Sequence, residues 1–173
     1  VESLSPHHGT YHARYNPPAF TTTHCYKSIS DGTVRHQRWY FRLGILPPSG
    51  GWTYVGAIQN TAWSYICRVR IYNSAGTYQV RLERFFPSQV EHTYNLASLS
   101  ANTYYAIEVK FVKDASAGEY RVYWQGSEVI TVTGLHTSGA GTLAIHMVGI
   151  TPSNSYGSPD LRIDCVKVAT DYI

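Results

Sequence analysis

The stretch T-Y-Y-A-I-E-V-K-F-V-K at residues 103–113 alternates apolar and polar side chains over most of its length. The apolar members fall on every second position: Tyr105, Ile107, Val109 and Phe111. A period of two places them on one face of a β-strand. Residues 119–124 and 128–133 are also strand-like, and Gln125-Gly126 between them is a two-residue turn signal. The stretch therefore predicts consecutive antiparallel strands over one hydrophobic interior.

The same pattern recurs along almost the whole chain. No long segment has a helical period, and clusters of Gly, Pro, Asn and Ser separate the apolar runs. The predicted strands are 9–15, 23–29, 34–46, 52–59, 65–72, 78–86, 89–96, 103–113, 119–124, 128–133, 142–150 and 160–169. About a dozen strands with short connections indicate a sandwich or barrel. No connection contains the crossover helix that a parallel α/β sheet requires, and we expect Trp39, Phe111 and Trp124 in the core.

One predicted hairpin, residues 65–72 with 78–86, allows a register to be assigned. The apolar pairs Ile71–Val80 and Val69–Leu82 align if they face the core. This register places Arg68 opposite Glu83 on the outer face, which is favourable. It also places Arg70 opposite Arg81, which is not. The predicted register therefore rests on the two apolar pairs and not on the charged ones.

The composition indicates a surface with few charges. Of the 173 residues, 43% are hydrophobic and 14% are charged, against about 25% charged in ordinary soluble domains. Fifteen Tyr and four Trp exceed what a core needs, and such surfaces predict an extracellular protein or one at a cell or virion surface. A net charge of +3 without a basic run argues against nucleic-acid binding. No apolar stretch is long enough for membrane insertion.

Several motifs resemble the concanavalin A-like and laminin-G-like superfamily. Tyr104-Tyr105-Ala106-Ile107-Glu108-Val109 is similar to its W-Y-x-I-E-V strand, and Tyr120-Arg121-Val122-Tyr123-Trp124-Gln125-Gly126 to its Y-x-V-Y-x-D-G hairpin. Residues 161–168 resemble its last strand and residues 9–15 its first. The resemblance implies an all-β, two-sheet antiparallel jelly-roll sandwich. Gln125 stands where the family usually has Asp, which alters the hydrogen bonding of the turn.

We expect one sandwich domain over residues 9–173, preceded by a flexible segment 1–8. A loose terminal segment can add a strand to a neighbouring sheet edge. Together with Tyr-rich faces, this segment suggests self-association. One alternative function is therefore a structural subunit of an extracellular filament, sheath or viral fibre.

Some proteins with this sandwich fold are enzymes, and their catalytic residues follow recognisable patterns. The eleven acidic residues are scattered, and only Asp160 and Asp164 are suitably spaced. This is not the E-x-D-x-x-E strand of the glucanases, whose carboxylates share one face, and we expect structural roles for this pair. Related lyases carry an arginine/glutamate strand, a Q-I-H or Q-V-H strand and a Tyr-rich strand. Arg81-Leu82-Glu83-Arg84 is similar to the first, but Ala144-Ile145-His146 lacks the Gln of the second. We therefore expect an outward charge ladder and no active site, with a lyase or hydrolase as the second alternative.

The histidines and cysteines predict no metal site and no cofactor. Neighbouring His side chains, as at His7-His8, point to opposite faces of a strand and rarely chelate together. No loop concentrates the hard oxygen ligands that calcium needs, although Asp31 and Asp114 are available. Three cysteines allow at most one internal disulfide, for which Cys25 and Cys165 are the candidates. Three buried thiols are an equally good interpretation.

The aromatic and amide residues of one region suggest a sugar-binding platform. Aromatic rings stack on the C–H faces of sugars, and amides bind hydroxyl groups. The predicted ligand-binding residues are Trp52, Tyr54, Gln59, Asn60, Trp63 and Tyr65. The main functional hypothesis is a non-catalytic extracellular carbohydrate-binding or adhesion module, with a polysaccharide or glycan as partner.

Overall fold

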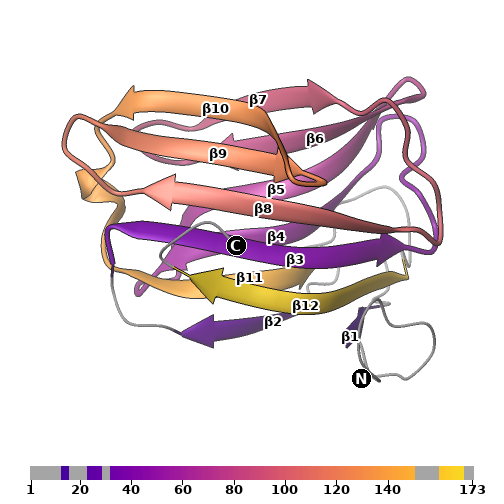
Figure 1. The fold of residues 1–173 in the computed structure, drawn as a ribbon, viewed down its shortest axis with the longest axis horizontal. Coiled ribbons are helices and arrows are strands. Elements are labelled where there is room, and N and C mark those ends of the chain that lie inside the picture. The colour runs from indigo at the N-terminus through magenta and orange to yellow at the C-terminus, as the bar shows by residue number, and fades with distance from the viewer. Residues whose placement is uncertain (1–12, 16–22, 29–31, 151–159, 170–173) are drawn as a thin grey trace.

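The computed structural model describes residues 13–15, 23–28, 32–150 and 160–169 (Figure 1). The predicted flexible segment 1–8, His7, His8 and Asp31 lie outside these residues. Twelve strands and one short 3₁₀ turn, η1 (Ser138–Ala140), make up the described part. The strands are β1 (Ala13–Tyr15), β2 (Thr23–Ser28), β3 (Val34–Leu43), β4 (Trp52–Asn60), β5 (Tyr65–Ser74), β6 (Thr77–Arg84), β7 (Val90–Asn95), β8 (Tyr104–Val112), β9 (Gly118–Trp124), β10 (Ser127–Leu135), β11 (Leu143–Ile150) and β12 (Leu161–Ala169).

The strands form two six-stranded sheets laid over each other (Figure 1). The front sheet, nearer the viewer, has the order β1-β12-β3-β8-β9-β10, and the back sheet has the order β2-β11-β4-β5-β6-β7. Every neighbouring pair is antiparallel. The predicted two-sheet antiparallel sandwich is therefore confirmed.

Large apolar side chains from both sheets fill the space between them. Trp39, Phe41 and Phe111 of the front sheet are fully buried, as is Ile71 of the back sheet. Trp124 is only partly buried, because it packs at the rim of the core with its ring stacked 5.0 Å from that of Tyr105. The core expected from the sequence is thus correct for Trp39 and Phe111, while Trp124 borders it.

A glycine in β4 lets the two sheets approach each other closely. A Cβ atom added to Gly56 would lie 2.6 Å from Cζ2 of Trp39. That distance is shorter than real Cβ contacts, so the largest core side chain requires a residue without a side chain opposite it.

The hairpin register predicted for residues 65–86 is confirmed in β5 and β6. Arg68 pairs with Glu83, and Arg70 pairs with Arg81. At the β9–β10 turn, Gln125 and Gly126 have φ values of 51° and 81°, as a tight two-residue hairpin needs. The Gln125 side chain accepts a hydrogen bond from the Ala106 amide at 2.8 Å. The unusual residue of this turn therefore ties it to β8.

Candidate functional site

The outer face of the back sheet carries a cluster of arginine, aromatic and acidic side chains. Val69 and Ile71 of β5 and Val80 and Leu82 of β6 are buried. Because strand side chains alternate, the residues between them point outward. We call this surface the arginine face; it comprises Trp52, Tyr54, Tyr65, Arg68, Arg70, Tyr72, Gln79, Arg81, Glu83, Gln89 and Glu91.

Guanidinium groups and aromatic rings alternate across this face. The Arg68 Cζ lies 4.5 Å from the ring centroid of Tyr54 and 4.8 Å from that of Tyr65. The Arg70 Cζ lies 5.8 Å from the centroids of both Tyr54 and Tyr72. Such cation–π contacts orient the guanidinium groups and remain favourable at partly exposed sites. The three side chains Arg68, Arg70 and Arg81 stay 16–19% exposed, so a ligand can reach them.

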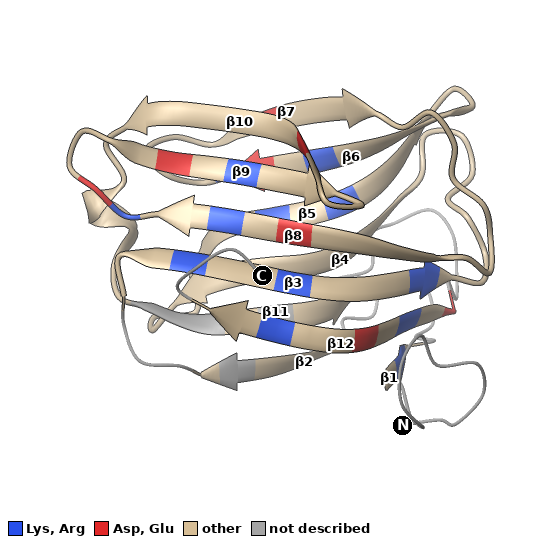
Figure 2. Ribbon diagram, viewed as in Figure 1, with Lys and Arg blue, Asp and Glu red and all other residues tan. Residues whose placement is uncertain are grey.

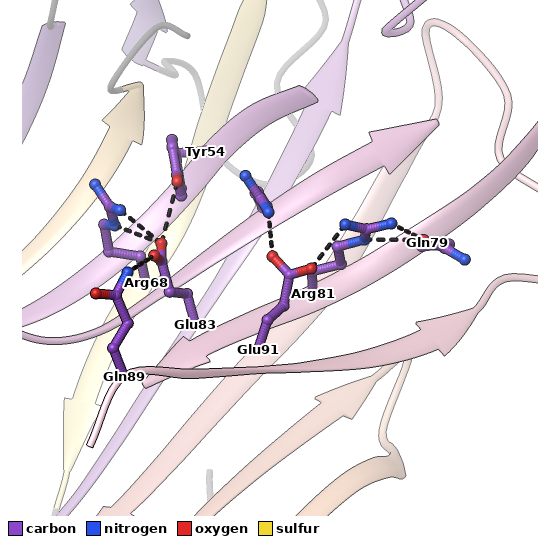
Figure 3. A network of polar contacts seen from close by, with 8 residues as sticks. Tyr54, Arg68, Gln79, Arg81, Glu83, Gln89 and Glu91 are labelled. Carbon is purple, nitrogen blue, oxygen red and sulfur yellow. Dashed lines mark hydrogen bonds and ion pairs between the residues drawn. The ribbon is translucent and has the colours of Figure 1, made fainter. Parts of the chain in front are cut away.

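Glu83 is the centre of the first polar group (Figure 3). Its Oε2 accepts hydrogen bonds from Arg68 Nη2 at 2.6 Å and from the Tyr54 hydroxyl at 3.2 Å, and its Oε1 accepts one from Gln89 at 2.8 Å. Burial alone would raise the pKa of Glu83, but Arg68, Gln89 and Tyr54 together hold it below its ordinary value. Glu83 is therefore a carboxylate at neutral pH and positions the Tyr54 hydroxyl.

Glu91 resolves the unfavourable Arg70–Arg81 pair. It projects from β7 and forms ion pairs with both guanidinium groups, with Arg81 Nη1 at 2.7 Å from Oε1 and Arg70 Nη2 on Oε2 (Figure 3). Gln79 Oε1 accepts two further hydrogen bonds from Arg81, at 2.7 and 2.9 Å. Arg70 and Arg81 thus bind a carboxylate of the protein itself, that of Glu91.

Tyr54 is the most buried hydroxyl of the cluster. Its side chain is 7% exposed, and burial raises its pKa although Arg68 and Arg70 act in the opposite direction. It therefore holds its proton at neutral pH and can act as a donor. Among the described residues, the Nε–H of Arg70 and the Nε1–H of Trp52 have no hydrogen-bond partner. Both of these donors are buried, so an anionic ligand would contact the exposed parts of Arg68, Arg70 and Arg81 and the positive charge that they carry.

The structure divides the predicted sugar platform into two parts. Trp52, Tyr54 and Tyr65 lie on the arginine face. Gln59 and Asn60 hold the β4–β5 loop: Gln59 Nε2 donates to the Trp63 carbonyl at 3.1 Å, and Asn60 Oδ1 accepts the amides of Ala62 and Ser64 at 3.0 Å. Gln59 is only 4% exposed, so these two amides support the loop.

The sequence prediction missed Arg68, Arg70, Gln79 and Glu91 as members of a site. The signal was present in the hairpin register, which puts Arg68 and Arg70 on the face that carries Arg81 and Glu83. That pattern was interpreted as a charge ladder. The aromatic partners on β4 and the acid on β7 make it a candidate site, and neither follows from the hairpin alone.

Other residues considered from the sequence have structural roles. His146 points between the sheets, where its Nδ1 lies 3.1 Å from Gln37 Oε1, and it is absent from the arginine face. Asp160 is ion-paired with Arg14 and Arg162, while Asp164 accepts a hydrogen bond from the Cys165 amide at 2.7 Å. Asp114 accepts the amides of Ser116 and Ala117 in a turn.

The suggested Cys25–Cys165 disulfide is not present. Cys25, Cys67 and Cys165 are all free thiols. Cys25 lies on β2 of the back sheet, whereas Cys165 lies at a bulge of β12 in the front sheet, and its Sγ is 3.3 Å from Asp164 Oδ1. The alternative of buried thiols is correct for Cys67 alone.

The outer face of the front sheet is charged but differently organised (Figure 2). A buried His36–Glu108 contact of 2.6 Å joins β3 to β8, and Arg121 bridges Glu119 and Glu128 at 2.9 and 2.8 Å. Its one cation–π contact between described residues is Arg38 over Tyr40. Within the described residues, no three His, Cys, Asp or Glu side chains converge as metal ligands. No described segment forms a helix of the length and apolarity needed to cross a bilayer.

Solved structures with the same architecture include several polysaccharide lyases. The alginate lyase Aly36B aligns with a TM-score of 0.63 and 13% identity, over 91% of this chain and 78% of its own. The heptameric SAP-like pentraxin of Limulus polyphemus aligns with a TM-score of 0.60 and 11% identity, over 88% of this chain and 73% of its own. The PL7 alginate lyase AlyA1 of Zobellia galactanivorans aligns with a TM-score of 0.56 and 15% identity, over 85% of this chain and 65% of its own. This chain therefore spans slightly less than two thirds of the length of that lyase.

These neighbours overturn two sequence-based expectations. Because many are alginate lyases, the interpretation as a non-catalytic carbohydrate-binding or adhesion module is not supported, and neither is the expectation of no enzymatic activity. No family model matches the sequence, and no curated protein matches it. What the structures share with this protein is architecture, and the chain has the concanavalin A-like jelly-roll fold.

Proposed function

We propose that this protein is a polysaccharide lyase that cleaves a uronate-containing polymer such as alginate on its arginine face. The observation that carries the proposal is the Tyr54 hydroxyl, held by Glu83 within a row of arginines. The structural neighbours support it, since one of them is an alginate lyase in complex with an alginate trisaccharide. Because a polymeric substrate is met outside the cell, we also propose an extracellular location.

Cleavage by β-elimination has requirements that this face can meet. The C5–H bond and the C4–O glycosidic bond break, a C4–C5 double bond forms, and no water is consumed. The uronate carboxylate must be neutralised so that the C5 proton can leave, and the departing oxygen must receive a proton. The reaction therefore needs a cation, a proton acceptor and a proton donor on one surface.

The arginine face supplies these three groups around Arg70. The guanidinium of Arg70 lies equally far, 5.8 Å, from the ring centroids of Tyr54 and Tyr72. A substrate carboxylate bound to Arg70 would thus lie near two phenol side chains, Tyr54 on the neighbouring strand β4 and Tyr72 two residues further along β5. The hydroxyl of Tyr54, whose raised pKa keeps it protonated, donates its proton to the leaving oxygen and becomes a phenolate. Tyr72, reacting as the phenolate beside Arg81, accepts the C5 proton and becomes a phenol.

Hydrolysis fits the same residues less well. Glycoside hydrolases commonly use a protonated carboxylic acid together with a second carboxylate. Glu83 and Glu91 are both ion-paired with arginine, and the lowered pKa of Glu83 keeps it ionised. Neither is a suitable proton donor, so elimination with phenols is the better reaction for this face.

The assay uses the purified protein with alginate, polymannuronate, polyguluronate, polygalacturonate and hyaluronan. We expect at least one polymer to yield products with the ultraviolet absorbance of a C4–C5 double bond, and with masses lower by one water than hydrolysis products. New reducing ends without unsaturation would identify a hydrolase and contradict the proposal. Binding without any cleavage would contradict it as well.

Glu91 competes with the substrate carboxylate for Arg70 and Arg81 in this scheme. Glu91→Gln removes one negative charge at nearly constant volume, which leaves both arginines available. We expect the variant to bind alginate severalfold more tightly at low ionic strength, with a steeper loss of affinity as salt is added. Calorimetric titration at two salt concentrations measures both effects, with Glu91→Gln and its parent both carrying Tyr54→Phe so that the alginate stays intact.

The matched control for this variant is Glu128→Gln, which removes one of the two carboxylate partners of Arg121 on the front sheet. It makes the same change in net charge away from the arginine face, so its effect on affinity should be small. If Glu91→Gln bound alginate as the wild type does, or more weakly, the competition would be disproved.

A further inference from the structure

We propose that Tyr26 and Trp63 form a second sugar-binding subsite on the outer face of the back sheet. Its ligand is a sugar ring of the same polysaccharide chain, bound away from the bond that is cleaved. The inference rests on the proposed function and extends it, because it makes the protein bind a chain of several sugars. The two residues belong to β2 and to the β4–β5 loop, outside the arginine face.

Both side chains are exposed to a degree that is unusual for large aromatic rings. Tyr26 is 54% exposed and Trp63 is 51% exposed, and their ring centroids lie 5.1 Å apart in an edge-to-face arrangement. Two adjoining rings that retain half of their surface in water make an apolar patch, and such patches mark binding sites. The C–H face of a sugar is a suitable ligand, since it stacks on aromatic rings while its hydroxyl groups stay hydrated.

Trp63 is held in place by its loop. It has a φ of 61°, in the left-handed region that a bulky residue adopts only under constraint. Its amide donates to the Asn60 carbonyl at 3.0 Å, its carbonyl accepts from Gln59 Nε2 at 3.1 Å, and Asn60 Oδ1 caps the loop. These bonds fix the loop backbone from which the ring projects, and the edge-to-face contact with Tyr26 restricts the ring, which lowers the entropic cost of binding.

The strand register puts this pair on the same side of the sheet as the arginines. Tyr26 pairs with Met147, Met147 with Ala57, and Ala57 with Arg68. Residues directly opposite each other on neighbouring strands share a face. Tyr26 and Arg68 are three strand spacings apart, roughly 14 Å, and the small Ala57 lies between them. An oligosaccharide can span this distance, whereas a single sugar cannot.

A remote subsite predicts that affinity depends on chain length. A short oligosaccharide reaches only the arginine face, whereas a longer one also covers Tyr26 and Trp63. The test uses Tyr26→Ala and Trp63→Ala, each combined with Tyr54→Phe so that the ligand stays intact. Calorimetric titration with alginate oligosaccharides of increasing length gives the dissociation constants.

We expect each substitution to weaken binding of long oligosaccharides about tenfold and to leave binding of the shortest bound oligosaccharide unchanged. Tyr94→Ala is the matched control: Tyr94 is 39% exposed, but it pairs with the buried Val80 and so does not share the arginine face. Equal affinities of Trp63→Ala and its parent for long chains would overturn the subsite.

A spectroscopic measurement keeps the test independent of the folding of the alanine variants. In Tyr54→Phe, which leaves the oligosaccharides intact, the indole N–H resonance of Trp63, assigned through Trp63→Phe, should shift on titration with long oligosaccharides and stay fixed with the shortest. If the wild type cleaves alginate but this resonance never moves, only the subsite is disproved. If none of the polymers is bound or cleaved, the proposed function fails, and the subsite fails with it.

Discussion

Replacing Tyr54 with phenylalanine should lower the rate of elimination at least a hundredfold. The substitution removes the hydroxyl that donates to Glu83 and, in the proposed reaction, to the leaving oxygen. Loss of a positioned proton donor costs about 10²–10⁴ in rate. The ring remains for Arg68 to stack on, and Glu83 keeps its bonds to Arg68 and Gln89. We therefore expect kcat to fall while affinity for the polymer stays close to that of the wild type.

Tyr123→Phe is the control for this experiment, because it removes a hydroxyl from the outer face of the front sheet. Unsaturated product from the polymer that the wild type cleaves, measured at several substrate concentrations, separates kcat from KM for both variants. Wild-type kcat in Tyr54→Phe would remove Tyr54 from the reaction. Equal losses in both variants would point to a general effect on the fold.

The second large effect concerns stability in mild acid. His146 is 3% exposed between the sheets, and burial, with Arg35 nearby, lowers its pKa to about 4 from the ordinary 6.5. The unfolded chain therefore takes up a proton at a pH where the folded protein does not. Stability falls as the pH drops from 6.5 towards 4, by about 3 kcal/mol in total for this one group.

The structural reason lies in the hydrogen bonding of the imidazole. Its Nδ1 is bonded to Gln37 Oε1, and its Nε2 is buried with no partner among the described residues. A proton added at Nε2 would be a buried donor without an acceptor, next to an arginine. Four described carboxylates have a lowered pKa: Glu83, Asp114, Glu119 and Glu128. Their stabilising effect is lost only below the ordinary pKa of 4.5, or 3.8 for Asp114, so this pH range is largely separate from that of His146.

Urea unfolding at pH 7 and pH 4.5 measures this effect. We expect the wild type to lose between about 2 and 3 kcal/mol over this range, and His146→Gln, which cannot titrate, to lose much less. The variant will be less stable than the wild type at pH 7. The quantity to compare is therefore the change in the free energy of unfolding between pH 7 and pH 4.5 in each protein. Equal slopes in the two proteins would show that His146 is not the responsible group.

Much of the architecture could be predicted because it depends on local alternation. The strand pattern of residues 103–133 led to the correct sheet structure, and the apolar pairs of β5 and β6 gave the correct register. The strand predicted over residues 34–46 is three residues too long at its end. That strand ends at Leu43, where the chain turns and Gly44 donates to the Asp160 carbonyl, and Ile45 is 53% exposed.

The candidate site could be predicted only in fragments. Trp52, Tyr54 and Tyr65 were identified from their residue types, and the Arg68–Glu83 pair from the hairpin register. Their union into one face depends on β4 lying beside β5, and the acid that joins Arg70 to Arg81 comes from β7. The alternation of apolar and polar residues predicts which face of the sheet a side chain lies on. It does not predict that β4 lies beside β5 or that β7 lies beside β6.

The sequence by itself determined the all-β class, most strand positions, the β5–β6 register and the burial of Trp39 and Phe111, because a period of two is a property of each strand alone. Only the tertiary structure decided that Glu91 separates two arginines, that Tyr26 meets Trp63, and that His146 faces the interior. These relations join strands that are distant in the chain, and they arise when hydrophobic burial between two sheets selects one order of strands from many compatible with the same pattern.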